Sequence, residues 1–144
     1  MDAWIENDWR ELGFYYELRE DRKERCLVGS RAGLRRFHEL LTAYIADDRN
    51  TKLSEHEHYD PFGSLEVMTW TSAGMDGHAI FGTLDDLGRL AKLVEQKLAV
   101  AVPGDQVRIA EDYAPNCGYA LILDVREDGY DPPQAEAELY GATG

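Results

Sequence analysis

The sequence predicts a small α+β protein in which a mainly antiparallel sheet of about six strands carries two helices on one face. Three observations support this class: a segment pattern that recurs after 53 residues, two helical apolar stripes, and several short runs rich in aromatic and β-branched residues. A chain of 144 residues can bury about two-thirds of its unfolded surface. We therefore expect one acidic domain over residues 1–144.

Each predicted helix begins after a residue that can cap it. Ser30 precedes residues 31–46 and Thr83 precedes residues 84–99, and a hydroxyl in that position accepts a hydrogen bond from a free backbone N–H. The apolar stripes consist of Leu34, Phe37, Leu41 and Ile45 in the first helix, and of Leu84, Leu87, Leu90, Val94 and Leu98 in the second. Each helix therefore has one face for burial.

The recurring pattern extends to the strands before each helix. A shift of 53 residues places residues 12–18 over residues 65–71, and each run continues through a polar link to a second apolar run. These patterns predict a duplicated β-β-α unit. After the turn at Pro103-Gly104, residues 107–125 predict a C-terminal hairpin that no helix follows, and from about residue 133 we expect a flexible tail.

The charge of the chain restricts its partners. It has 28 acidic and 15 basic residues, a formal net charge of -13, which repels nucleic acid and anionic lipid and favours a basic protein partner. The alternative is that the charge only aids solubility. The two cysteines, Cys26 and Cys117, match no zinc or disulfide pattern, and the sequence shows no signal peptide or membrane span. We expect a cytoplasmic protein.

No catalytic or cofactor-binding residue is assigned. His38 and His78 accompany no nucleophile motif, and the glycines before the second helix lack the lysine of a phosphate-binding loop. Asp85 and Asp86 in the first turn of that helix would repel a phosphate. The sequence therefore favours a protein that is not an enzyme.

Residues 55–60 (EHEHYD) are the one cluster with the composition of a metal site. In an extended strand His56, His58 and Asp60 point to one side, which offers two imidazoles and a carboxylate to a single ion. A small metal- or ligand-binding domain or an enzyme built on this cluster is the alternative function. Against it, alternating histidine and glutamate residues are common in polar loops.

Aromatic and acidic residues also gather between residues 55 and 70, with Trp4 and Trp9 elsewhere. Aromatic side chains supply contact area and carboxylates attract a basic partner, so this segment is the predicted binding surface. The residues assigned to it are Glu55, Glu57, Tyr59, Asp60, Phe62 and Trp70. The alternative is that Val67 and its alternate neighbours face the core.

Several of these segments resemble a known family. Residues 55–59 (EHEHY), 65–70 (LEVMTW), 82–87 (GTLDDL) with Leu90-Ala91, and 123–125 leading to 129–132 (GYDP) resemble bacterial polymorphic-toxin immunity proteins of the immunity protein 32 family, over about residues 50–133. The resemblance implies a cytoplasmic protein that binds a toxin domain and blocks its active site, and it supplies no catalytic residues. Apart from the resemblance, strand edges at the margin of the sheet could pair two copies of the chain, so a monomer and a homodimer both stay open.

Overall fold

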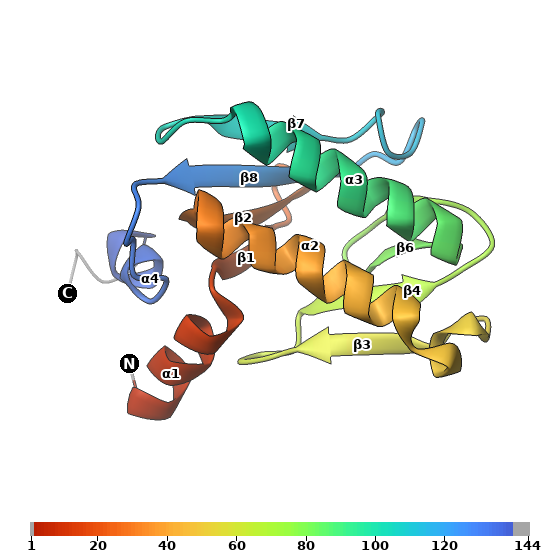
Figure 1. Cartoon of the computed structure of the whole chain (residues 1–144), viewed down its shortest axis with the longest axis horizontal. Helices are drawn as coiled ribbons and strands as arrows, with labels where there is room; N and C mark the ends of the chain where they lie inside the picture. Colours follow the sequence, from red (N-terminus) through yellow and green to blue (C-terminus); the bar gives the residue numbers. More distant parts are fainter. Residues whose placement is uncertain (1, 140–144) are drawn as a thin grey trace.

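The computed structural model describes residues 2–139 (Figure 1). In that range the helices are α1 (Ala3–Leu12), α2 (Arg31–Ala46), the short 3-10 helix η1 (Asp48–Thr51), α3 (Leu84–Val100) and α4 (Gln134–Leu139). The strands are β1 (Tyr15–Arg19), β2 (Glu24–Ser30), β3 (His56–Tyr59), β4 (Leu65–Thr69), β5 (Gly74–Met75), β6 (Ile80–Gly82), β7 (Gln106–Ile109) and β8 (Ala120–Arg126).

The strands form two four-stranded sheets. Sheet A has the order β1-β2-β8-β7 and sheet B the order β3-β4-β6-β5. In each sheet the two central strands are parallel and each outer strand is antiparallel to its neighbour. The α+β class is therefore confirmed, but one mainly antiparallel sheet of about six strands is corrected to two mixed sheets. The residue pattern of a strand indicates which face is buried and not which strand lies beside it.

The two halves of the chain follow the same path. The first half is β1, β2, α2, β3 and β4, and the second is β5, β6, α3, β7 and β8. Each half gives one antiparallel pair to each sheet, because β1–β2 and β7–β8 lie in sheet A while β3–β4 and β5–β6 lie in sheet B. The repeating unit is thus β-β-α-β-β, longer than the predicted β-β-α unit. The predicted C-terminal hairpin exists and is the counterpart of β3 and β4.

Both helix predictions are confirmed, including their first residues. The Ser30 hydroxyl accepts from the Gly33 N–H at 3.0 Å, and the Thr83 hydroxyl accepts from the Asp86 N–H at 3.1 Å. The predicted stripes are buried at Leu34, Phe37, Leu41, Leu87, Leu90, Val94 and Leu98. None of the helices within residues 2–139 combines the length and the apolar composition needed to cross a bilayer.

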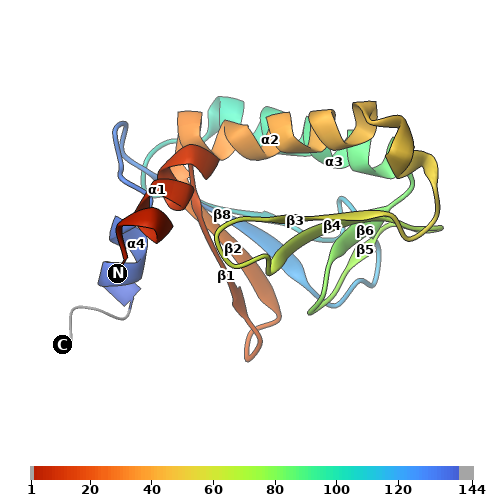
Figure 2. The same ribbon diagram turned by 90° about the horizontal axis from the view of Figure 1, so that it is seen from below.

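The two long helices form one layer over both sheets. Figures 1 and 2 show α2 and α3 side by side, and the sheets lie on one side of them. Helix α2 carries the chain from β2 of sheet A to β3 of sheet B, and α3 carries it back from β6 to β7. The predicted placement of two helices on one face is confirmed, and this helix pair joins the two sheets.

The N-terminal segment forms a helix that the sequence pattern did not predict. The first strand begins at Tyr15, after α1, instead of near residue 12. Trp9 is fully buried and its ring centroid lies 4.7 Å from that of Tyr15 and 4.8 Å from that of Tyr16. Trp9 is therefore a core residue, whereas Trp4 is exposed.

The segment after β8 also forms a helix. Helix α4 occupies residues where a frayed tail was expected, and Ala135 in its first turn is buried against the core. Residues 140–144 lie outside the described residues.

An ion pair between α1 and the turn before α4 predicts a pH effect. Arg10 Nε lies 2.9 Å from Asp131 Oδ1, and this hydrogen bond holds the pKa of Asp131 below its ordinary value. A depressed folded-state pKa adds stability above the unfolded-state value of about 3.9, and that stability is lost as pH falls through the folded-state value. Asp131→Asn should therefore lower the melting temperature slightly at neutral pH and not at strongly acidic pH.

Thermal melting followed by circular dichroism measures this difference, with Asp128→Asn as the control on an exposed carboxylate nearby. The effect is small because both partners are about half exposed. An equal deficit of Asp131→Asn at neutral and strongly acidic pH would contradict the assignment.

Candidate binding pocket and histidine cluster

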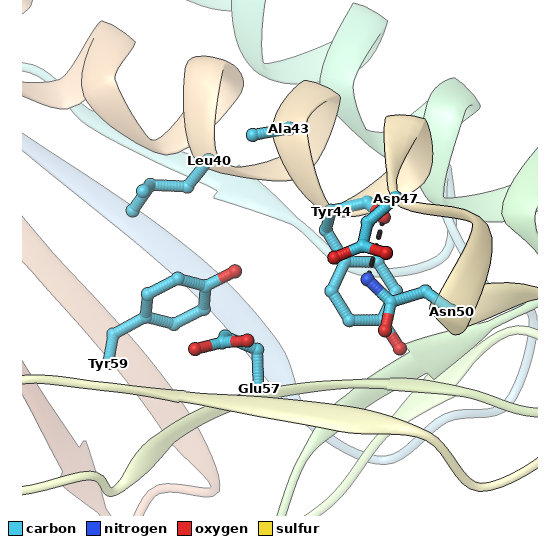
Figure 3. Close-up of a pocket in the computed structure, with 7 residues that line it drawn as sticks. All are labelled: Leu40, Ala43, Tyr44, Asp47, Asn50, Glu57 and Tyr59. Atoms are coloured by element: carbon cyan, nitrogen blue, oxygen red, sulfur yellow. Dashed lines mark hydrogen bonds between the residues drawn. The ribbon is translucent and has the colours of Figure 1, made fainter.

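Strand β3 divides its side chains between two faces. His56 and His58 are exposed, whereas Glu57 and Tyr59 are half-buried and point toward α2 (Figure 3). This alternation is the ordinary period of two along a strand. The predicted cluster is therefore split into a histidine pair on the outer face of sheet B and an acidic and aromatic pair beneath the helix.

Glu57 and Tyr59 line a pocket between β3 and the C-terminal half of α2. Its volume is about 210 Å³, which suits one side chain better than a whole cofactor. The residues that line it are Leu40, Ala43, Tyr44, Asp47, Asn50, Glu57 and Tyr59 (Figure 3). Apolar walls are provided by Leu40, Ala43 and the two tyrosine rings. Asp47 and Asn50 lie at and just beyond the C-terminal end of α2.

The polar groups of the pocket are mostly hydrogen-bond acceptors. Asp47 and Glu57 contribute carboxylates, and the guanidinium of Arg49 lies between them, with Nη2 at 3.5 Å from Asp47 Oδ2 and 3.6 Å from Glu57 Oε2. Burial raises the pKa of Tyr59, so that its hydroxyl is neutral at physiological pH. The pocket therefore already holds one cationic group at its carboxylates.

Asn50 adds an unused acceptor. Its side chain is buried, and its Nδ2 donates to the Tyr44 carbonyl at 2.8 Å. Its Oδ1 has no hydrogen-bond partner among residues 2–139. A buried carbonyl oxygen without a partner costs free energy, which a donor entering the pocket would recover if it reached this atom.

The remaining predicted binding residues lie at the two ends of β4. Asp60 and Phe62 are in the turn before it, where the Tyr16 hydroxyl accepts from the backbone N–H groups of Phe62 and Gly63 at 3.1 Å. The Phe62 side chain is 60% exposed. Trp70 follows the other end of β4, directly after Thr69, whose N–H donates to the Glu55 carbonyl, and is 39% exposed. The structure thus places Asp60 and Phe62 at one end of the β3–β4 pair and Glu55 and Trp70 at the other, with Glu57 and Tyr59 on β3 between them.

The histidine pair gains a carboxylate from the neighbouring strand. His58 lies opposite Glu66 in the register of β3 and β4, and His56, His58 and Glu66 have ligand atoms that all lie within 4.8 Å of one another. Asp60, the third ligand predicted from sequence, follows the end of β3 and is not part of this group. The strand pairing, which the sequence did not show, supplies Glu66 instead.

Residues considered for nucleophilic catalysis have structural roles. Burial raises the pKa of the Cys26 thiol to about 11, which keeps it protonated at neutral pH. His38 joins the helix pair, with Nδ1 2.9 Å from the Ala91 carbonyl oxygen and Nε2 3.2 Å from a Glu95 oxygen. Neither side chain adjoins the pocket.

Sequence reasoning missed Asp47, Arg49 and Asn50. They lie in the connection after α2, where their composition is that of an ordinary polar turn. Only the return of β3 beneath α2 brings them to Glu57 and Tyr59. Comparisons of the chain with known protein families, with curated proteins and with solved structures found no match.

Proposed function

We propose that this protein acts by binding a basic protein partner and is not an enzyme. In its most specific form, it is a cytoplasmic immunity protein that neutralises a toxin domain, as the resemblance of residues 50–133 implies. The observation that carries the proposal is the pair of carboxylates, Asp47 and Glu57, that holds a guanidinium at an apolar pocket. An arginine or lysine of a partner would take the place of the exposed Arg49 side chain at the same carboxylates, with its aliphatic stem on the apolar walls.

The charge of the segment that forms one side of the pocket supports this proposal. Residues 47–70 contain six acidic and two basic side chains, within a chain of net charge -13. Such a field attracts a positively charged surface and raises the rate of encounter. A nuclease toxin needs a basic surface to bind phosphates, so an acidic protein that covers that surface would also block its substrate.

An exposed aromatic side chain on the turn between β3 and β4 provides contact area. Phe62 is 60% exposed on a turn that Tyr16 fixes through two hydrogen bonds, and its ring centroid lies 5.7 Å from that of the buried Trp9. An aromatic residue that is held in place before binding loses little conformational entropy when a partner covers it. Phe62 and the pocket are therefore the expected anchors of the interface.

The test is binding to a purified toxin domain encoded beside this gene, measured by stopped-flow mixing and surface plasmon resonance. Asp47→Asn combined with Glu57→Gln should raise the dissociation constant about 30-fold, the equivalent of roughly 2 kcal/mol, because a partner cation would lose both carboxylates. The association rate of the unchanged protein should fall as salt rises.

The matched control is Glu127→Gln combined with Asp128→Asn, which removes the same charge from an exposed turn after β8. It should lower the association rate slightly and leave the dissociation rate unchanged. A complex whose association does not depend on salt would remove the electrostatic part of the proposal. Equal losses of affinity in the two double variants would show that the pocket does not bind the partner.

A further inference from the structure

The outer face of sheet B, away from the helix layer, carries the group formed by His56, His58 and Glu66. His56 and His58 are alternate residues of β3, and Glu66 lies opposite His58 on β4. Both imidazoles are exposed, and the Glu66 side chain is 17% exposed on the more central strand. The group therefore has one ligand whose side chain is mostly buried, Glu66, and two whose side chains are exposed.

Backbone contacts determine which ring nitrogens are free. His56 Nδ1 lies 3.1 Å from the Ser54 carbonyl oxygen, and His58 Nδ1 lies 2.7 Å from the Gly63 carbonyl oxygen. A carbonyl oxygen only accepts hydrogen bonds, so each Nδ1 must donate, and in a neutral imidazole the lone pair is then on Nε2. Metal-binding histidines have the same arrangement, in which one nitrogen donates to a carbonyl and the other coordinates the ion.

His58 and Glu66 face each other across more than a hydrogen-bond length. His58 Nε2 lies 3.6 Å from Glu66 Oε1, which exceeds the length of an ordinary hydrogen bond. With a neutral imidazole, both atoms present lone pairs to the same space. A cation between them would satisfy both, and the ring centroid of His56 lies only 5.1 Å from that of His58, so a second nitrogen is within reach.

We propose that His56, His58 and Glu66 form a zinc-binding site with three protein ligands and an open fourth position. Zinc prefers imidazole nitrogens and carboxylate oxygens at about 2.1 Å, which places tetrahedral ligand atoms about 3.4 Å apart. The present separations, within 4.8 Å, require side-chain rotations that the two exposed imidazoles can make. Because both imidazoles are exposed, the fourth position would face solvent, where water or a partner's side chain can occupy it.

This site does not depend on the proposed function, because the pocket is on the opposite face of β3. Glu57 and Tyr59 point toward α2, whereas the imidazoles point away from it. Zinc binding and partner binding can therefore be lost independently.

The test is titration of the metal-free full-length protein with zinc chloride by isothermal calorimetry, and with cobalt(II) followed by visible absorption. One zinc ion per chain should bind at micromolar protein concentration, and cobalt should give the intense absorption bands of a tetrahedral site. His58→Ala and Glu66→Gln should each weaken zinc binding at least about tenfold. Their circular dichroism spectra should match the unchanged protein.

Two control variants distinguish this site from unspecific binding. His78→Ala removes an exposed histidine outside the group, and Glu57→Gln removes a carboxylate from the other face of β3; neither should change zinc affinity. No binding to the unchanged protein would overturn the proposal. An affinity that falls equally in His78→Ala and His58→Ala would also overturn it, and if Glu66→Gln fails to fold, His56→Ala provides the same test.

Discussion

Gly33→Ala should destabilise the protein by about 3 kcal/mol, although the same change within a helix usually stabilises by up to about 1 kcal/mol. A Cβ atom on Gly33 would lie 2.2 Å from the carbonyl oxygen of Gly13, which ends α1 with a φ of +99°. The start of α2 therefore touches the end of α1 backbone to backbone. Urea denaturation measures the loss, which should accompany faster hydrogen exchange in α1.

Gly88→Ala is the matched control in the second helix. A Cβ atom there meets only Ile45 Cδ1, at 3.8 Å, an ordinary van der Waals contact. This variant should be stabilised by about 0.5–1 kcal/mol because alanine favours the helix. If both variants changed stability in the same direction, the close approach of α1 to α2 would be refuted.

Arg25→Ala should lower the free energy of unfolding by about 3–5 kcal/mol. Arg25 is 3% exposed on β2 of sheet A, and it donates from Nε to the Asp76 carbonyl at 3.0 Å and from Nη1 to the Ser64 carbonyl at 3.2 Å. Burial lowers the pKa of its guanidinium, which still remains charged. The alanine variant would lose both hydrogen bonds and leave a cavity between the sheets.

Arg25→Met separates these two effects. Methionine retains most of the aliphatic stem and removes the guanidinium with its charge and its hydrogen bonds, so its loss of stability should be clearly smaller than that of alanine. Guanidinium chloride denaturation gives the free energies, and hydrogen exchange should increase first around residues 64 and 76–79. Stability equal to that of the unchanged protein in both variants would show that the guanidinium does not join the sheets.

The helices were predictable because their signals are local. A cap such as Ser30 and a stripe such as Leu34, Phe37 and Leu41 act within a few residues of one another, and the structure confirms both. The sheet partners depend on contacts between distant residues, so the parallel pairing of β2 with β8 and the division into two sheets were missed. The missed α1 has a mixed polar and aromatic composition, and its burial depends on Trp9 meeting Tyr15 and Tyr16.

Each candidate site likewise combines a part that local sequence predicts with a part that distant residues supply. Alternation along residues 55–60 separated the histidines from Glu57 and Tyr59, which a strand pattern can show. The partners that complete each site come from other elements: Asp47 and Asn50 from the end of α2 and η1, and Glu66 from β4. Their proximity follows from the path of the chain, which no local spacing encodes.

Each half of the chain gives one hairpin to each sheet, so neither sheet can be completed by the first half alone during synthesis. A nascent chain that ends at β4 has β2 and β4 without the strands β8 and β6 that later lie beside them. Such open edges are where other chains attach. Val28 pairs with Asp124, so sheet A is finished only after residues about 100 positions further along the chain have been synthesised. The chain is therefore most prone to aggregation during its synthesis on the ribosome, before β8 has emerged to pair with β2.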